Sequence, residues 1–174
     1  MLTKSPQDIQ RIVDGLGYDF TKYDIEDFVH YIERLRKGQI MVRRWELQRD
    51  VSGVWLPGMT FELVAYNTLH HPILQTHGIL HEIGHMVLGH KTIPLTDVIS
   101  PEILAEFDID IPINGQARLS RKEHSFSPED IEAERFAFAI QKRVLHHNRV
   151  TKLYRSGSTV PEFKPYVDGM GFED

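Results

Sequence analysis

The 174-residue sequence contains no cysteine, so it can form neither a disulfide nor a thiolate site. This absence fits a reducing compartment. The first residues also lack the apolar core of a signal peptide, so we expect a cytoplasmic protein. No apolar run approaches the roughly 18 residues that would span a bilayer, and there is no internal repeat or low-complexity tract. The net charge of −5 argues against a dedicated nucleic-acid-binding protein, which would usually be basic.

The composition and the apolar patterns indicate one globular domain over residues 1–174, of the α+β class. Hydrophobic residues make up 41% of the chain and charged residues 26%, and this length suffices to bury a core. Apolar residues at helical spacing predict a first, short helix that Ser5 and Pro6 open and that Gly15 and Gly17 end. They predict a second helix from about 24 to 37, with Gly38 as the residue that ends it.

Downstream of the second helix the pattern changes to strands separated by glycine and proline. We expect strands within 40–47, over 51–57 and over 60–67, which would form a small, mostly antiparallel sheet. The third strand leads into the next helix, so it should line a cleft as an edge strand to which an extended peptide could pair. We interpret the cluster of Arg43, Arg44 and Arg49 with Trp45 as an exposed strand edge and not as a nucleic-acid patch, because the net charge is negative.

The most informative stretch is an H-E-x-x-H motif, formed by His81, Glu82 and His85 in an apolar helix predicted over 72–89. Residues four apart project from one face of a helix, so the two imidazoles can share one metal ion. Glu82 is rotated by about 100°, which places its carboxylate beside the ion. Zinc is the expected metal and manganese the alternative. Such an ion activates water, and Glu82 could serve as general base and then as general acid.

The motif could also arise by chance, because the chain has ten histidines and a match is expected in about 4% of such sequences. Its apolar surroundings favour a metal site, since buried histidines and a buried glutamate need partners. The three-histidine class H-E-x-x-H-x-x-G-x-x-H is excluded, because Leu88 and Lys91 occupy its glycine and histidine positions. The nearby histidines are interpreted as loop or helix-surface residues (His70, His71 and His77) or as a cation favoured at the helix C-terminus (His90).

A helix predicted over residues 128–145 offers a third metal ligand. On a helical wheel Asp130 and Glu134 fall on the apolar stripe, whereas Glu132 points to the opposite side. Buried carboxylates need a partner. We therefore expect Asp130 to bind the metal, and Glu134 to accept the free N–H of a ligand histidine.

Other roles are open for residues in and around this helix. Asp130 could instead form a capping box with Ser127, which is the expected N-cap, and Glu129 is the main rival as ligand. No oxyanion-stabilising group is identified. Five residues could serve, although each is better explained as structural or surface: Tyr66, His124, His146, His147 and Tyr154.

Residues 91–126, between the two motif helices, carry weaker signals. A short helix over 101–107 and a strand from residue 109 are expected. The polar segment 116–124 is interpreted as a flap over the site. Residues 148–174 are expected to form a C-terminal tail or docked arm.

The two motif stretches together resemble the ImmA/IrrE family of metallo-endopeptidases. The resemblance is carried by His-Glu-Ile-Gly-His-Met-Val-Leu-Gly-His at 81–90 and Asp-Ile-Glu-Ala-Glu-Arg-Phe-Ala at 130–137, and it covers about residues 24–145. It implies a zincin-like domain with a gluzincin-type site in which Asp130 is the third ligand, and the family's usual asparagine falls at Glu134. It also implies a cytoplasmic protease of a bacterium or phage, whose usual target is a helix-turn-helix repressor encoded nearby.

The leading hypothesis is therefore zinc-dependent hydrolysis of a peptide bond in a protein substrate. It involves one zinc ion, no direct nucleic-acid contact and no membrane. An alternative from another class is a non-catalytic, zinc-stabilised regulatory module that binds a repressor or antitoxin partner. The intact Glu82 favours the enzyme, because a purely structural site has no use for that carboxylate. A non-peptidase hydrolase is a third option.

Overall fold

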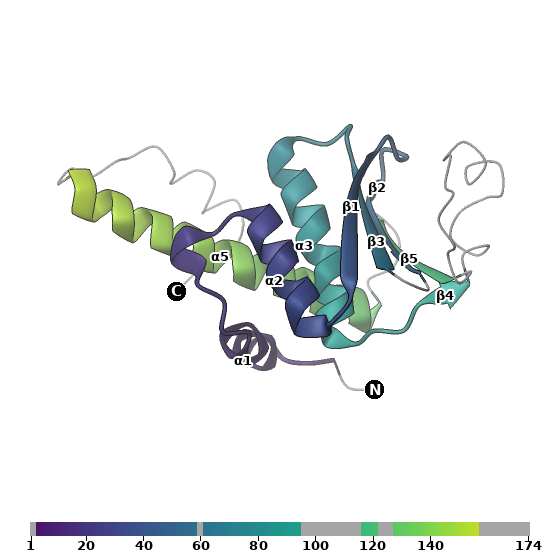
Figure 1. The fold of residues 1–174 in the computed structure, drawn as a ribbon, viewed down its shortest axis with the longest axis horizontal. Coiled ribbons are helices and arrows are strands. Elements are labelled where there is room, and N and C mark those ends of the chain that lie inside the picture. The colour runs from purple at the N-terminus through teal and green to yellow at the C-terminus, as the bar shows by residue number, and fades with distance from the viewer. Residues whose placement is uncertain (1–2, 59–60, 95–115, 122–126, 157–174) are drawn as a thin grey trace.

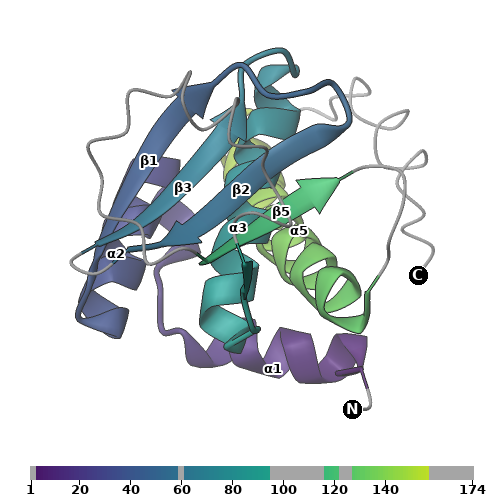
Figure 2. The same cartoon turned by 90° about the vertical axis from the view of Figure 1, so that its right-hand side faces the viewer.

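The computed structural model describes residues 3–58, 61–94, 116–121 and 127–156, which form one mixed sheet with helices on one side of it (Figures 1 and 2). The predicted α+β class is confirmed. None of the helices in these ranges is long and apolar enough to cross a membrane. The elements are α1 (Pro6–Gly15), the 3₁₀-helix η1 (Phe20–Lys22), α2 (Ile25–Arg36), β1 (Gln39–Trp45), β2 (Val51–Pro57), β3 (Phe61–Asn67), α3 (Pro72–Leu88), β4 (Ile93–Pro94), β5 (Gln116–Arg121) and α5 (Pro128–Ser156).

The five described strands lie in the order β1-β3-β2-β5-β4. β2 runs antiparallel to both β3 and β5, and β4 runs antiparallel to β5, whereas β1 is parallel to β3. The sheet is thus mostly antiparallel, as predicted. The prediction that β3 is an edge strand was wrong, because β1 and β2 pair with it on its two sides. Its backbone hydrogen-bonding groups are therefore used within the sheet and are not open to an extended peptide.

The edges of the described sheet are β1 and β4 instead. Arg43 and Arg44 on β1 are both exposed, as expected for a strand edge. The chain that leads from β1 to β2 is held by Asn67, which is fully buried at the end of β3. The side-chain amide of Asn67 donates to the carbonyls of Gln48 (2.8 Å) and Val51 (2.7 Å). This fixes the connection that lets β1 reach the far side of β3.

The polar segment predicted as a flap belongs in part to the sheet. Residues 116–121 form β5, which pairs with β2 in a register that sets Leu119 opposite Val54. The flap interpretation was therefore wrong for these residues, because their backbone groups complete the free side of β2. Residues 122–124, the helix expected over 101–107 and the strand expected from residue 109 lie outside the described ranges.

The predicted helices α1 and α2 are confirmed, and side chains cap their first turns. Ser5 and Asp8 form a capping box at α1. The carboxylate of Asp24 accepts the first free N–H groups of α2. At the end of α2 the left-handed residue is Lys37, with φ of 56°, and not the expected Gly38. The backbone N–H groups of Lys37 and Gly38 both donate to the carbonyl of Glu33. The left-handed turn that ends the helix therefore lies one residue earlier than predicted.

One apolar core joins the four described α-helices to the sheet face that they cover. α1 belongs to this core through Ile9 and Val13, although it precedes the 24–145 range of the family resemblance. α5 continues to Ser156. The segment from residue 148, predicted as a tail or arm, is therefore helical as far as that residue. Residues 157–174 lie outside the described ranges.

Candidate metal centre

The H-E-x-x-H motif lies in the most deeply buried part of α3. The helix begins with Pro72, a residue suited to a first helical turn, and ends at Gly89 with φ of 69°. Every residue from 78 to 86 is buried, because the sheet packs against one side of α3 and α5 against another. His85 and Glu82 are fully buried, and His81 is 5% exposed.

Two glycines set how closely α3 approaches its neighbours. A Cβ added to Gly78 would lie 2.8 Å from the carbonyl oxygen of Ser52, so α3 rests directly on the backbone of β2. A Cβ added to Gly84 would lie 3.2 Å from both the Cα and the carbonyl oxygen of Ala133 in α5. Gly84 lies between the two motif histidines, and Ala133 lies between Asp130 and Glu134. This close crossing brings the polar side chains of both helices together.

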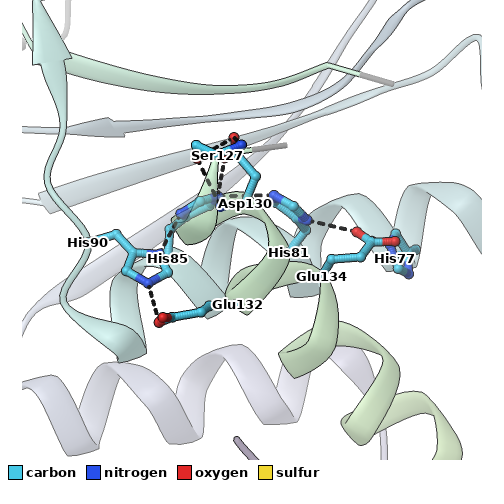
Figure 3. A network of polar contacts seen from close by, with 8 residues as sticks. All are labelled: His77, His81, His85, His90, Ser127, Asp130, Glu132 and Glu134. Carbon is cyan, nitrogen blue, oxygen red and sulfur yellow. Dashed lines mark hydrogen bonds and ion pairs between the residues drawn. The ribbon is translucent and has the colours of Figure 1, made fainter. Parts of the chain in front are cut away.

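His81, His85 and Asp130 meet at the crossing (Figure 3). The Nε2 atoms of the two histidines are 3.0 Å apart, and Oδ1 of Asp130 is 3.5 Å from Nε2 of His85. One ligand atom from each of the three residues lies within 4.8 Å of the others. Zinc–nitrogen distances of about 2.0–2.1 Å at tetrahedral angles would place two bound nitrogens about 3.3 Å apart. The spacing and the donor types therefore fit one shared zinc ion.

The geometry of Asp130 is compatible with both of the roles that were weighed as alternatives. Its Oδ2 accepts hydrogen bonds from the hydroxyl (2.6 Å) and the backbone N–H (3.2 Å) of Ser127, whose hydroxyl accepts from the Asp130 N–H. The other carboxylate oxygen, Oδ1, faces His85. The capping box thus orients the carboxylate and leaves one oxygen directed at the histidines. Glu129 is in neither of the two groups of described residues that could hold a metal.

Glu134 binds the outer side of His81. Nδ1 of His81 donates to Oε2 of Glu134 at 3.0 Å, and Nε2 of His77 donates to the same oxygen at 3.0 Å. Burial alone would raise the pKa of Glu134, but these two hydrogen bonds outweigh it and lower that pKa to about 2. Glu134 is therefore an ionised acceptor, which keeps the hydrogen of His81 on Nδ1 and leaves Nε2 for a metal.

The interpretation of His77 as a surface residue was wrong, because its side chain is only 16% exposed and lies against α5. Burial tends to lower its pKa, but contacts with Glu134 and Gln141 raise it overall. The overlooked signal is its position four residues before His81, which places both on one face of the helix. With His81 and Glu134, His77 forms the second described group that could hold a metal.

The prediction that Glu132 points away from the core was also wrong, since this residue is 5% exposed. It contacts His90, which follows the end of α3 as predicted and is 9% exposed. Nε2 of His90 donates to Oε2 of Glu132 at 3.1 Å, and Nδ1 of His90 lies 2.8 Å from Nδ1 of His85. Lys4, before α1, binds the other side of Glu132. No local sequence pattern predicts a contact between residues 4 and 132.

Glu82 lies against β2. A Cβ added to Gly53 would come within 3.2 Å of both Cγ and Oε1 of Glu82, so this side chain occupies the space that the glycine leaves. Glu82 belongs to neither group that could hold a metal. Its side chain therefore contacts β2, and its carboxylate oxygens are not among the grouped ligand atoms.

None of the residues considered for oxyanion stabilisation that the structure describes belongs to a group that could hold a metal. Tyr66 packs against the apolar core. His146 is exposed and His147 half-buried on α5, and none of these three is in a group that could hold a metal. His124 and the side chain of Tyr154 lie outside the described part of the chain.

The fold and the site define an α+β protein with a candidate metal centre of two histidines and one carboxylate. Comparisons with models of protein families, with curated proteins and with solved structures each gave no match to this chain. The family resemblance of the two motif stretches therefore stays a prediction, and the geometry of the site is the main basis for a functional proposal.

Proposed function

We propose that this protein is a zinc-dependent endopeptidase of the zincin-like H-E-x-x-H type. The observation that carries the proposal is the cluster of ligand atoms from His81, His85 and Asp130 within 4.8 Å, on two helices in contact. Glu82 supports a catalytic role over a purely structural one, because it is a fully buried carboxylate that follows His81 directly in the motif and is not itself a ligand.

The residues of the chain divide the chemistry between them. His81, His85 and Asp130 would hold the ion, and Glu134 orients His81 through its hydrogen bond. When bound, zinc supplies the Lewis acid that activates water and polarises the peptide carbonyl. The Glu82 carboxylate accepts a proton from the attacking water and later donates it to the leaving nitrogen. Manganese is the alternative ion.

The proposed substrate is a helix-turn-helix transcriptional repressor encoded nearby, in the cytoplasm of a bacterium or phage. This part of the proposal is supported only by the resemblance of residues 81–90 and 130–137 to the ImmA/IrrE family. Cleavage of such a repressor would switch on genes of a mobile element or a stress response. The protein would act on the repressor and not on DNA, which agrees with its net charge of −5.

Replacement of Glu82 by glutamine tests the mechanism. We expect Glu82→Gln to keep one metal ion per chain, because the ligands are unchanged. Cleavage of the co-expressed neighbouring repressor should fall by about 10²–10⁴-fold, since a general acid–base group is lost. Metal analysis and the mass of the repressor are the two measurements. The matched control is Glu46→Gln, a substitution of an exposed glutamate that should leave both unchanged.

Two results would contradict the proposal in different ways. Undiminished cleavage by Glu82→Gln would exclude this glutamate as the catalytic base. An intact repressor in a stoichiometric complex with the wild-type protein would instead identify the non-catalytic regulatory module. Asp130→Ala tests the third ligand separately, since its loss should reduce the metal content of the purified protein.

A further inference from the structure

A buried polar chain runs from the N-terminal arm to the candidate metal centre. It passes from Lys4 to Glu132, then to His90 and then to His85 (Figure 3 shows the last three). The contacts are 2.7 Å from Lys4 Nζ to Glu132, 3.1 Å from Glu132 to His90 and 2.8 Å between the Nδ1 atoms of the two histidines. Glu132, His90 and His85 are all 9% exposed or less.

The positions of the hydrogens along this chain follow from the direction of His85. Its Nε2 faces His81 and Asp130, so a metal bound there requires that atom to carry no hydrogen. The hydrogen of neutral His85 then sits on Nδ1 and is donated to Nδ1 of His90. The hydrogen of neutral His90 must accordingly sit on Nε2, where the Glu132 carboxylate accepts it.

Glu132 is held as an acceptor by donors on its other side. The backbone N–H of Lys4 donates to Oε1 and the Lys4 ammonium donates to Oε2, each at 2.7 Å. Arg135 donates to the carbonyl of Lys4 at 2.7 Å, which fixes the arm against α5. The positive charge of Lys4 offsets the negative charge of Glu132.

We infer that His90 and Glu132 are positioning residues for the metal centre, holding His85 in the tautomer whose Nε2 is free to bind the ion. The inference rests on the metal site of the proposed function and not on peptide hydrolysis. On the other ligand histidine the same task falls to Glu134, which receives the Nδ1 hydrogen directly. His85 reaches its carboxylate through an intervening imidazole, and so depends on His90 as well as on Glu132.

Cobalt binding separates this role from simple packing. His90→Phe keeps an aromatic ring of similar size but removes the acceptor for the Nδ1 hydrogen of His85. It should weaken Co²⁺ binding by about tenfold to a hundredfold and change the visible absorption of the bound ion. His90→Asn places an amide oxygen near the position of Nδ1 and should restore most of the affinity. Glu132→Gln keeps the shape but removes the charge, and should cost about tenfold.

The matched control is His30→Phe, which replaces an exposed histidine on α2 and should bind Co²⁺ like the wild type. Thermal unfolding of the metal-free variants is measured in parallel. If His90 only filled space, His90→Phe would bind Co²⁺ with wild-type affinity and absorption whatever its stability, and the inference would be overturned. A wild-type protein that binds no Co²⁺ would overturn the metal site itself, and the inference with it.

The imidazole nitrogens of the zinc-loaded protein provide an independent readout. In nitrogen–proton correlation spectra, His85 should carry its hydrogen on Nδ1 and His90 on Nε2. In Glu132→Gln the His90 signals should move most, since its acceptor has lost its charge. A His90 that carries its hydrogen on Nδ1 in the zinc-loaded wild type would overturn the inference while leaving the metal site intact.

Discussion

At the scale of single residues, two glycines, which have no side chain, matter as much as the proposed metal ligands. Gly84 allows α3 to touch the backbone of α5 at Ala133, and Gly53 leaves the space that the Glu82 side chain occupies. A methyl group at either position would meet a backbone oxygen at 3.1–3.2 Å, which cannot move aside as a flexible side chain could. The two positions control different parts of the site, so their substitutions should have different effects.

Gly84→Ala should separate α3 from α5 and so move Asp130 away from the two histidines. We expect a loss of stability of about 1–3 kcal/mol, together with weaker metal binding. Denaturant unfolding and metal titration measure the two effects. Gly15→Ala is the control, because nothing lies within 4 Å of the added methyl group. Wild-type metal affinity in Gly84→Ala would show that the close crossing is not needed for the site.

Gly53→Ala should push the Glu82 carboxylate without touching the metal ligands. We expect the metal content to stay at one ion per chain and peptide cleavage to fall by up to about a hundredfold, as for a misplaced catalytic group. The pair of measurements is the same as for Glu82→Gln. Loss of the metal in Gly53→Ala would show that the position of Glu82 and the ligand cluster are coupled.

The sequence predicted the ligand-type residues better than their surroundings. His81, Glu82 and His85 could be found because their spacing is a property of one helix. Asp130 and Glu134 could be found because they share the apolar stripe of another. The burial of Glu132 could not be predicted, because a helical wheel with a single buried stripe places this residue on the solvent side. Its burial comes from contacts with the N-terminal arm.

At the scale of elements, α5 supports the site because α3 packs against one of its sides and the N-terminal region against another. One side carries Ala133 against Gly84 of α3. The other is tied to the N-terminal region by the bonds of Glu132 and Arg135 with Lys4, and by the ion pair of Arg143 with Asp14 of α1. Both of its neighbours are distant in sequence, which explains why the periodicity of α5 alone could not predict these contacts.

The order of the strands escaped prediction for a similar reason. Local patterns located β1, β2 and β3 but contained no information on which of them lies in the middle. β1 pairs in parallel with β3, so the chain that leaves β1 must pass the end of β3 to reach β2 on its other side. The side-chain amide of Asn67 holds this connection between β1 and β2 in place. A register of this kind depends on contacts that form only when the whole sheet is assembled.

The junction between α2 and β1 gives a pH-dependent prediction. Burial would raise the pKa of Glu33, but hydrogen bonds from His30 (2.6 Å) and from the N–H of Ile40 (2.7 Å) lower it overall. A carboxyl group with a lowered pKa in the folded state stabilises the fold above its unfolded pKa. This contribution is lost as the pH falls through the folded value.

Glu33→Gln should therefore be less stable than the wild type near pH 7, and the difference should shrink as the pH falls below about 4.5, the ordinary value for a glutamate. Urea unfolding at a series of pH values measures the free energy of unfolding. Glu46→Gln serves as the control, since that glutamate is exposed in the connection between β1 and β2. Parallel pH profiles for the wild type and Glu33→Gln would contradict the prediction.

At the scale of the whole molecule, a bound metal would link parts of the chain that are far apart. Residues 86–129 separate His85 from Asp130, so an ion held by both joins α3 to α5 across that segment. A ligand that binds only the folded state stabilises it by about 2.7 kcal/mol at a hundred times its dissociation constant. Removal of the metal should consequently weaken the entire fold and not only the site.

A chelator should therefore lower the unfolding temperature of the zinc-loaded wild type, and added zinc should restore it. Differential scanning calorimetry of the loaded, stripped and reloaded protein measures this shift. Asp130→Ala is the informative comparison, because it lacks one ligand and should show a smaller difference between the loaded and stripped forms. Equal unfolding temperatures for the loaded and stripped wild type would exclude a metal that bridges the two helices.

The close contact of α3 with α5 also has a consequence for the timing of synthesis. A ribosome produces the H-E-x-x-H segment well before Asp130, and the capping box that orients this aspartate is made with it. Lys4 is among the first residues to emerge. Its backbone N–H and ammonium groups can form their hydrogen bonds to Glu132 only after that residue has been made. A growing chain thus carries two of the three proposed ligands for a long interval without the third. The proposed metal centre could assemble only when nearly all of the described structure has been made, so an unfinished chain would lack the proposed hydrolase activity.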